Sequence, residues 1–271
     1  VVSLERDGAS AVVALDDGRH LRAPLAVDTD GRGSPTRRGA GIGVTEWRYQ
    51  QTGIVTTVAH ERAHQGIAQE HFLTAGPFAI LPLRGHRSSI VWTEGSKLAQ
   101  RLLTLDETEF TAELALRFGD YLGPLRPVGP RFSYPLALLH ADTYVVPRLA
   151  LAGDAAHAMH PIAGQGLNMG LRDVAALAEV VVDGIRLGLD VGSPAVLARY
   201  QHWRRFDNSL MLAATDGLNL LFSNDVAPVR LARDVGLAAV DRIGPVKRLF
   251  MRQAMGLMGN DRPRLVRGET L

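Results

Sequence analysis

An acid, two histidines and several glycines lie close together in LALAGDAAHAMHPIAGQGLNMG, which begins at Leu149. Gly153 and Asp154 directly follow an apolar run that predicts a buried strand. The Asp154 carboxylate should therefore project from the C-terminal end of that strand, where ligands of open α/β sheets bind. There it can accept hydrogen bonds from the hydroxyls of a sugar or polyol. In the alternative interpretation Asp154 caps the following turn through its own backbone, and both interpretations stay open at this point.

The segment after these residues combines a glycine-rich loop with the start of a helix. In PIAGQGLNMG, Gly164 and Gly166 let backbone N–H groups approach a ligand that a Cβ atom would block. The unpaired amides and the positive end of the helix dipole favour negative charge or an electron-rich carbonyl. A helix that merely begins with glycines is the simpler explanation. The order of strand, Gly-Asp, loop and helix favours a binding site.

His157 and His160 raise the question of a metal site. Their spacing would place both on one face of a helix, but Pro161 argues against a helix there, and no third ligand is near. We expect them to form hydrogen bonds within the loop, and no metal. The chain has no G-x-S-x-G motif and no Walker loop, so hydrolysis through a serine nucleophile and phosphoryl transfer lack support.

Composition narrows the remaining classes of function. The chain has 271 residues, is 46% hydrophobic, has a formal net charge of +2 and contains no cysteine. A core of useful size is possible, thiolate chemistry is excluded, and no nucleic-acid partner is indicated. No run of about 18 apolar residues predicts a membrane span, so a cytoplasmic location is the default expectation.

The N-terminal part must position the acid-containing loop. Asp7-Gly8 and Asp17-Gly18 predict the turns of a meander with three strands that ends near Val27. DTDGRGSPTRRGAG follows, where Ser34 can cap a short helix that begins at Pro35. From Glu46 to about His140 the pattern predicts an inserted antiparallel sheet with one helix from Asp106 to Tyr121.

TYVVPRLALAGD then predicts a strand that is buried on both sides, and a helix follows Gly164. We expect its apolar face to be Leu167, Leu171, Val174, Ala178 and Val181, with small residues Gly170, Ala175 and Ala176 allowing close packing on a sheet. After Val191 the chain should be mostly helical, with breaks at Pro228 and Pro245.

These motifs resemble those of the single-component FAD-dependent aromatic hydroxylases. DTDGRGSPTRR is similar to their Asp-Gly motif, and LALAGDAAHAMHPIAGQGLNMGLRDV to their Gly-Asp motif. YQHWRRFDNSLMLAATDGLNLLFS and GPVKRLFMRQAMG resemble the C-terminal helices of the ubiquinone-biosynthesis branch.

The resemblance implies a mixed α/β fold: a partial Rossmann-like FAD-binding domain (1–45 and 141–190), an inserted antiparallel β-sheet substrate domain (46–140) and a helical C-terminal region (191–271).

The same resemblance implies roles for particular residues. Gly153 and Asp154 would serve the ribityl chain of FAD, and Asp30 and Gly31 would lie near its pyrophosphate. The flavin edge would be lined by Pro161, Gly164, Gln165, Gly166, Leu167 and Asn168. It further implies NAD(P)H and O2 as co-substrates and an aromatic substrate, specifically a polyprenyl phenol. No catalytic acid or base can be assigned, because His60, His64, His71 and Arg84 fit packing or surface roles better.

The chain departs from this family at its start. Family members begin with a strand, a G-x-G-x-x-G turn and a helix, a unit of about 30 residues that binds the ADP half of FAD. Only 29 residues precede Asp30, and their only glycines are Gly8 and Gly18. The sequence therefore indicates an N-terminally truncated chain with an exposed sheet edge, marginal stability and weak FAD binding.

Three functions remain open: a ubiquinone-pathway hydroxylase, a flavin hydroxylase of a soluble aromatic compound, and a non-catalytic fragment or assembly module that binds other biosynthesis subunits. A polyprenyl substrate would bring the protein to the surface of the inner membrane, and SLMLAATDGLNLLF with the basic residues after it could form an interfacial helix. A helix packed on the FAD domain is the alternative.

Overall fold

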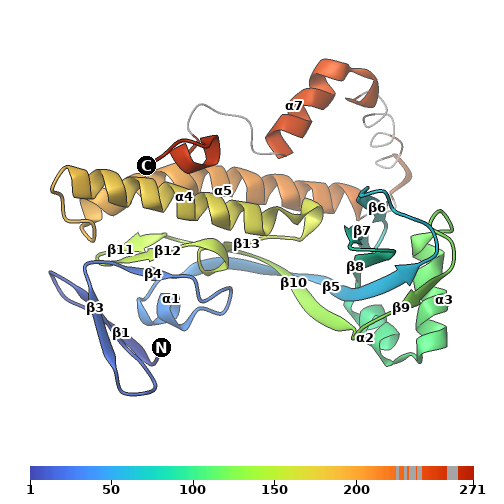
Figure 1. Cartoon of the computed structure of the whole chain (residues 1–271), viewed down its shortest axis with the longest axis horizontal. Coiled ribbons are helices and arrows are strands. Elements are labelled where there is room, and N and C mark those ends of the chain that lie inside the picture. The colour runs from blue at the N-terminus through green and yellow to red at the C-terminus, as the bar shows by residue number, and fades with distance from the viewer. Residues whose placement is uncertain (224–225, 229–230, 232–235, 237–239, 255–261) are drawn as a thin grey trace. The chain divides into compact units, whose positions relative to one another are not determined.

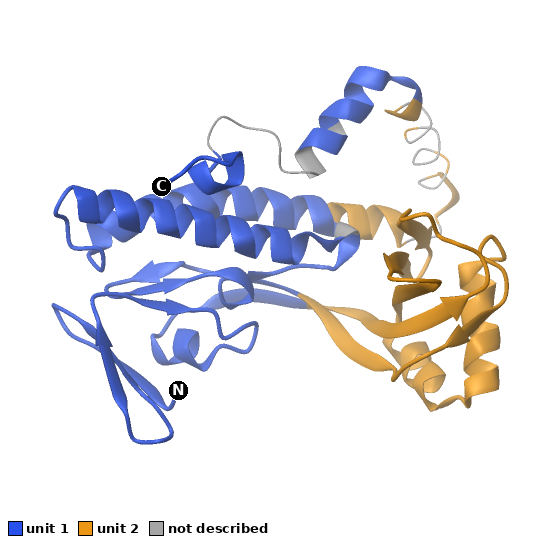
Figure 2. Cartoon of the chain, in the orientation of Figure 1, with its two compact units in different colours: residues 1–47, 138–216, 242–271 blue, residues 48–137, 217–241 orange. Residues whose placement is uncertain are grey.

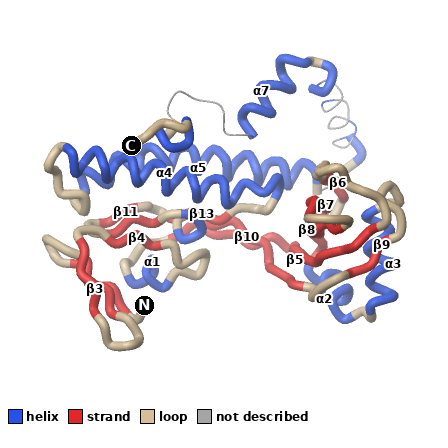
Figure 3. The backbone as a smooth tube through the Cα atoms, viewed as in Figure 1, coloured by secondary structure: helices blue, strands red, loops and turns tan. Residues whose placement is uncertain are grey.

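The computed structural model describes residues 1–223, 226–228, 231, 236, 240–254 and 262–271 (Figure 1). The chain divides into two compact units, one of residues 1–47, 138–216 and 242–271 and the other of residues 48–137 and 217–241 (Figure 2). Their helices and strands are distinguished in Figure 3.

The first unit opens with a three-stranded antiparallel meander of β1 (Ser3–Arg6), β2 (Ala11–Ala14) and β3 (His20–Ala23). The Asp7 carboxylate accepts the N–H groups of Ala9 and Ser10 at 2.7 and 2.5 Å, which closes the first turn. The meander ends at Ala23 and not near Val27, because the next strand, β4 (Ala26–Asp28), pairs in a different sheet.

That second sheet contains a parallel pair of strands. β4 runs parallel to β12 (Leu149–Leu151), and β11 (Val145–Val146) lies antiparallel on the other side of β12. All of β12 is fully buried, as the apolar run predicted. The order β11-β12-β4 leaves β4 at the edge of this sheet in the described parts of the chain.

Helices cover this sheet and supply most of the remaining core. α1 (Pro35–Gly39) is capped by the predicted Ser34, whose hydroxyl accepts the Arg37 N–H at 2.8 Å. α4 (Gln165–Arg186) and α5 (Pro194–Phe222) follow, with short 3-10 turns η1 (Gly153–Ala155), η2 (Ile162–Gly164) and η3 (Arg264–Arg267), β13 (His157–Ala158) and α7 (Gly244–Ala254). Part of the predicted helical C-terminal region lies outside the described residues.

The predicted apolar face of α4 is wrong in part. Leu167, Leu171 and Val174 are 74, 58 and 51% exposed, whereas Met169, Ala175, Ala176, Leu177 and Val180 are buried. The helix turns its small residues toward the sheet, and a Cβ on Gly170 would lie 3.4 Å from the Gly153 Cα. Close backbone approach therefore decides which face packs.

The second unit is built around an antiparallel sheet, as the inserted segment predicted. Its strands are β6 (Gln69–Leu73), β7 (Gly76–Leu83), β8 (Arg87–Gly95), β9 (Leu125–Pro127) and the greater part of β5 (Val44–His60) and β10 (Phe132–Ala141), in the order β10-β5-β8-β7-β6 with β9 on β5. The end of β10 pairs with β13 through Leu139 and His140, which belong to the first unit. Ile54, Phe78, Ile90 and Trp92 are fully buried in its core.

Helical structure in this unit is more extensive than predicted. α3 (Glu107–Phe118) matches the expected helix and is capped by Asp106, which accepts the Glu109 N–H at 2.8 Å. A second helix, α2 (Ser96–Thr104), precedes it. It begins after Gly95 without a side-chain cap, so the sequence offers no start signal for it.

Candidate functional site

The two acid-containing motifs leave the sheet at the same edge. Asp28, the last residue of β4, is paired in register with Leu151, the last residue of β12. The Ala152 N–H then donates to the Asp28 carbonyl at 3.0 Å and extends the pairing by one step. Because the strands are parallel, the segments that carry Asp30 and Asp154 both start at their carboxyl ends, where α/β proteins bind ligands.

The Asp30 segment is organised by an acid that the sequence analysis missed. Asp28 is 3% exposed, and its two carboxylate oxygens accept the Asp30 N–H at 2.9 Å and the Ser34 hydroxyl at 2.6 Å. Asp30 is itself exposed and accepts the Thr36 hydroxyl at 2.6 Å. Gly31 follows at φ 86°, a conformation that suits glycine. In the sequence, only the close spacing of the two acids in DTD could have indicated a role for Asp28.

Arg37 joins this segment to the Gly-Asp turn and was also missed. Its guanidinium is 4% exposed and donates to the Ala155 carbonyl at 2.7 Å and to the Arg32 carbonyl at 2.8 Å. Burial lowers the pKa of Arg37, although the Asp28 carboxylate opposes that shift. Arg37 lies in a five-residue helix beside another arginine, a pattern that is typical of a solvent-exposed segment.

Asp154 is exposed at the end of β12. Among the described residues its carboxylate makes no hydrogen bond or ion pair, while the neighbouring Ala156 N–H donates to the Gly153 carbonyl at 2.8 Å. The turn is therefore closed by a backbone hydrogen bond, with Gly153 at φ 60°, and no side chain caps it. The carboxylate has acceptor capacity for a ligand.

The start of α4 has no side-chain cap. Gly164 occupies the cap position at φ 61°, and the first turn of the helix holds no acid. Pro161 and Gly166 are half-buried and Gln165 is buried, whereas Gly164, Leu167 and Asn168 are exposed. No described atom would lie within 4 Å of a Cβ on Gly164 or Gly166. This end of the helix can receive a group that carries negative charge.

The two loop histidines differ in their surroundings. No group of metal-ligating side chains occurs in the parts of the chain that the structure describes. The Nε2 atom of His157 lies 2.5 Å from the Asp173 carboxylate of α4, so its partner is on the helix and not within the loop as expected. His160 is fully buried, and burial lowers its pKa to about 4, which leaves it neutral at pH 7.

The histidines of the second unit have packing roles, as the sequence indicated. His60 is 6% exposed and lies 2.8 Å from the Arg62 carbonyl and 3.1 Å from the Ser88 hydroxyl. His64 and His71 contact the carbonyls of Leu83 and Arg117 at 2.8 and 3.2 Å.

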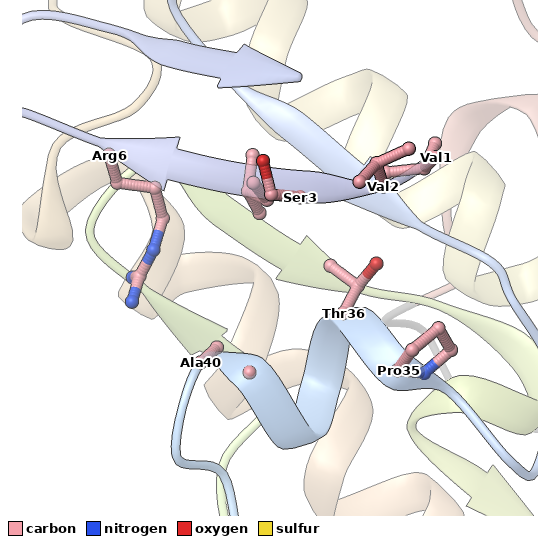
Figure 4. A pocket seen from close by; sticks show the side chains of 9 residues that line it. Val1, Val2, Ser3, Arg6, Pro35, Thr36 and Ala40 are labelled. Atoms are coloured by element: carbon pink, nitrogen blue, oxygen red, sulfur yellow. The ribbon is translucent and has the colours of Figure 1, made fainter. Parts of the chain in front are cut away.

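A cavity of about 230 Å³ lies between β1 and α1 and is not part of this site (Figure 4). Its one charged lining residue, Arg6, donates to the Pro147 carbonyl at 3.0 Å. Thr36, which also lines it, donates its hydroxyl to Asp30.

The residues at the strand ends fit a flavin dinucleotide. The Asp154 carboxylate, which has no hydrogen-bond partner among the described residues, suits ribityl hydroxyls. The start of α4, which has no side-chain cap, suits the electron-rich edge of a flavin. Gly153 and Gly164 both have a positive φ, which glycine adopts without strain, and neither places a Cβ atom on its loop. The individual assignments of Asp30, Gly31, Gly153, Asp154, Pro161 and residues 164–168 stay predictions.

Comparison with known proteins supports the same ligand. The model of the family described as FAD binding domain matches residues 1–209. The chain is 60% identical over 273 residues to a ubiquinone hydroxylase, UbiL, of Rhodospirillum rubrum, covering 100% of this chain and 64% of that protein. It is 38% identical over 257 residues to the 3-demethoxyubiquinol 3-hydroxylase of Escherichia coli, covering 95% of this chain and 66% of that protein.

Solved structures agree on the fold. The p-nitrophenol 4-monooxygenase PnpA of Pseudomonas putida superposes with a TM-score of 0.76 at 22% identity, over 96% of this chain and 66% of that one. The chain thus spans slightly less than two thirds of the proteins that it matches. With the family model matched over most of its length, the chain belongs to the FAD-binding-domain family that its Asp-Gly and Gly-Asp motifs resemble.

Proposed function

We propose that this chain supplies the flavin-facing and substrate-binding parts of an FAD-dependent monooxygenase that hydroxylates the aromatic ring of a polyprenyl phenol in ubiquinone biosynthesis. The names of the two bacterial relatives support the substrate class. The observation that carries the proposal is the exposed Asp154 carboxylate, which has no partner among the described residues and stands at the end of a buried parallel strand.

In this proposal each predicted residue has a defined task. Asp154 accepts the ribityl hydroxyls, on a turn that Gly153 permits, while Asp30 and Gly31 face the pyrophosphate. Pro161, Gly164, Gln165, Gly166, Leu167 and Asn168 line the flavin edge. The amides at the start of α4 stabilise negative charge on the ring. FAD, when bound, supplies the transfer of electrons from NAD(P)H to O2 that hydroxylation requires.

The protein's own part is to bind, orient and exclude water, because the cofactor carries the redox chemistry. We assign substrate binding to the second unit, whose strand β7 offers buried Phe78 and Ile80 beside half-exposed Leu81 and Leu83. We assign no general acid or base to the described site.

The ADP half of FAD requires a further structural unit. β4 is an edge strand, and beside it lies an apolar hollow of about 500 Å³. It is lined by Pro24, Leu25, Val27, Val174, Leu177, Ala178, Val181, Ile185 and Val191. We propose that a strand and helix of a G-x-G-x-x-G unit occupy this edge and hollow, within the length by which the relatives exceed this chain. Without that unit we expect weak FAD binding.

Peripheral membrane contact is a separate part of the proposal. None of the helices in the described ranges is long and apolar enough to cross a membrane. Leu218, Leu220 and Leu221 near the end of α5 are exposed, which suits the interfacial stretch that the sequence indicated. Sedimentation of the full-length protein with anionic vesicles at low salt is expected, and its complete absence would contradict this contact.

Replacement of Asp154 tests the central claim. In the full-length protein, Asp154→Ala should weaken FAD binding by about tenfold or more, the effect of losing a hydrogen bond to a carboxylate. Its thermal midpoint without FAD should not change, because the carboxylate bonds nothing in the described structure. Asp16→Ala, at another exposed acid, is the matched control. If Asp154→Ala binds FAD as tightly as the parent protein, as measured by flavin fluorescence, the proposal is wrong.

The substrate claim has its own test. Hydroxylation by the loaded full-length enzyme should require a long isoprenoid chain on the phenol. Equal turnover of the unprenylated phenol would favour a hydroxylase of soluble aromatic compounds. A full-length protein that binds FAD but oxidises no NAD(P)H with either phenol would favour an assembly module.

A further inference from the structure

A buried carboxylate lies directly beneath the Gly-Asp turn. Asp173, on the third turn of α4, is 0% exposed. Its Oδ2 atom accepts the Gly153 N–H at 3.0 Å and lies 2.5 Å from His157 Nε2. Because an ionised carboxylate only accepts, that imidazole nitrogen carries the proton. One oxygen of Asp173 thus holds both ends of the segment that contains Asp154.

The other oxygen of Asp173 is held from α5. Oδ1 accepts the Arg204 Nε at 2.8 Å and the Asn208 Nδ2 at 3.1 Å. Arg204 is 2% exposed and also donates to Asp207 at 2.6 Å and to the Asn208 carbonyl oxygen at 2.8 Å. Burial by itself would raise the pKa of Asp173, but His157 and Arg204 outweigh it and the pKa is lowered.

These contacts divide the two carboxylate oxygens between two tasks. The Oδ1 contacts join α4 to α5 and serve the packing of the unit. The Oδ2 contacts go to the turn alone, and the turn is also held by Arg37 at the Ala155 carbonyl and by the close approach of Gly170 to Gly153. A turn held at these three points fixes the backbone of the intervening Asp154, and with it the Cα–Cβ bond from which the carboxylate extends.

We propose that Asp173 is a positioning residue of the flavin site: through the Gly153 N–H and His157 it holds the Asp154 carboxylate in the orientation that receives the ribityl chain. This rests on the proposed function of Asp154. In this proposal the buried cluster of Asp173, His157 and Arg204 affects cofactor affinity as well as stability.

Two variants separate the two roles. Arg204→Met removes contacts on the Oδ1 side and leaves the Gly153 and His157 contacts in place. Asp173→Leu combined with Arg204→Met removes both ions and replaces them by apolar groups of similar size, which folded proteins often tolerate. Only the double variant takes away the acceptor for the Gly153 N–H. Comparing it with Arg204→Met therefore isolates the effect on the turn.

Two readouts are measured on both variants. Amide hydrogen exchange of residues 153–158, which needs no FAD, should be faster by about tenfold in the double variant than in Arg204→Met, because a buried amide loses its partner. FAD binding by the full-length protein should weaken by about the same factor. Exchange in α2 and α3, in the other unit, serves as the internal control.

Each outcome is decisive. Unchanged exchange at residues 153–158 overturns the positioning role without bearing on Asp154. Faster exchange with unchanged FAD affinity also overturns it, provided that Asp154→Ala weakens FAD binding. If Asp154→Ala has no effect on FAD, the proposed function fails and not the placement of the turn.

Discussion

At the scale of single residues, surroundings decide what each acid does. Asp154 is exposed and bonds no described group, whereas Asp28 and Asp173 are buried and accept several N–H or O–H groups. A buried ion without partners is costly, so a buried acid organises structure while an exposed unpartnered one is available to a ligand. The same residue type therefore appears in this site in two distinct roles.

A buried histidine, His160, and a half-buried one, His140, predict that acid destabilises the protein. Burial lowers the pKa of His160 to about 4, with Asp216 opposing, and that of His140 to about 4, with Arg205 and His157 acting in the same direction. The unfolded chain binds these protons near pH 6.5, so the folded state loses stability as the pH falls from about 6.5 toward 4. Urea unfolding midpoints measured from pH 7.5 to 4.5 should decrease.

A variant tests the cause of that slope. In His140→Gln the decrease between pH 6.5 and 4.5 should be smaller than in the parent chain, because one titrating group is removed. The same slope in both proteins would show that His140 does not contribute.

At the scale of elements, small residues determine how closely the helices approach the turns. Gly170 lets α4 approach Gly153, and Gly164 ends the loop at a positive φ. A helix start without a capping side chain leaves its amides for a ligand. Stability and binding should therefore respond differently to changes in glycine residues.

Gly166→Ala should separate these two effects. A Cβ on Gly166 meets no described atom, so the variant should be as stable as the parent or more stable by up to about 1 kcal/mol, the gain of alanine over glycine in a helix. FAD affinity of the full-length protein should fall, because the new Cβ occupies the space assigned to the flavin. Gly217→Ala in α5, equally free of neighbours, is the control that should leave FAD affinity unchanged.

Gly192→Ala should destabilise the first unit. A Cβ there would overlap the Pro24 carbonyl and lie 2.6 Å from Arg148 Nη1, and Arg148 is paired with Asp190 at 2.5 Å. Overpacking of this kind costs about 1–3 kcal/mol, which should lower the urea midpoint. Gly129→Ala, which meets nothing within 4 Å, should leave it unchanged. An unaltered midpoint in Gly192→Ala would contradict the tight packing.

At the scale of the whole molecule, the first unit has an edge strand and an apolar hollow on the same side. β4 has one partner strand in the described sheet, and α4 contributes Val174 and Ile185 to the hollow, at 51 and 62% exposure. Apolar surface next to an unpaired edge favours association with another segment. This is the physical basis for assigning the dinucleotide-binding unit to this place.

Ile185→Lys tests that assignment. Its exposure means that the chain described here should fold with the substitution, whereas a charge in the hollow should oppose docking of the helix and weaken FAD binding in the full-length protein by about tenfold or more. Leu116→Lys, at a 79% exposed leucine of α3, is the matched control. Equal FAD affinity in the two variants would place the unit elsewhere.

The sequence alone was sufficient for features that depend on local pattern. The meander turns, the Ser34 cap, the buried strand before Asp154, the helix after Gly164 and the inserted antiparallel sheet all follow from periodicity and turn chemistry within short windows. The two motifs, in their order, also indicated the FAD-binding family that the comparisons show.

Only the tertiary structure decided which side chains form the hydrogen bonds that hold the site together. Asp28, Arg37 and Asp173 bond partners that are distant in sequence or held by turns, and His157 bonds α4 instead of its own loop. The buried face of α4 is likewise the one on which Gly170 approaches Gly153, and not the one that carries Leu167 and Leu171. Local pattern records which side chains are polar or apolar, but the cost of burying a charge depends on which donors the folded chain brings to it.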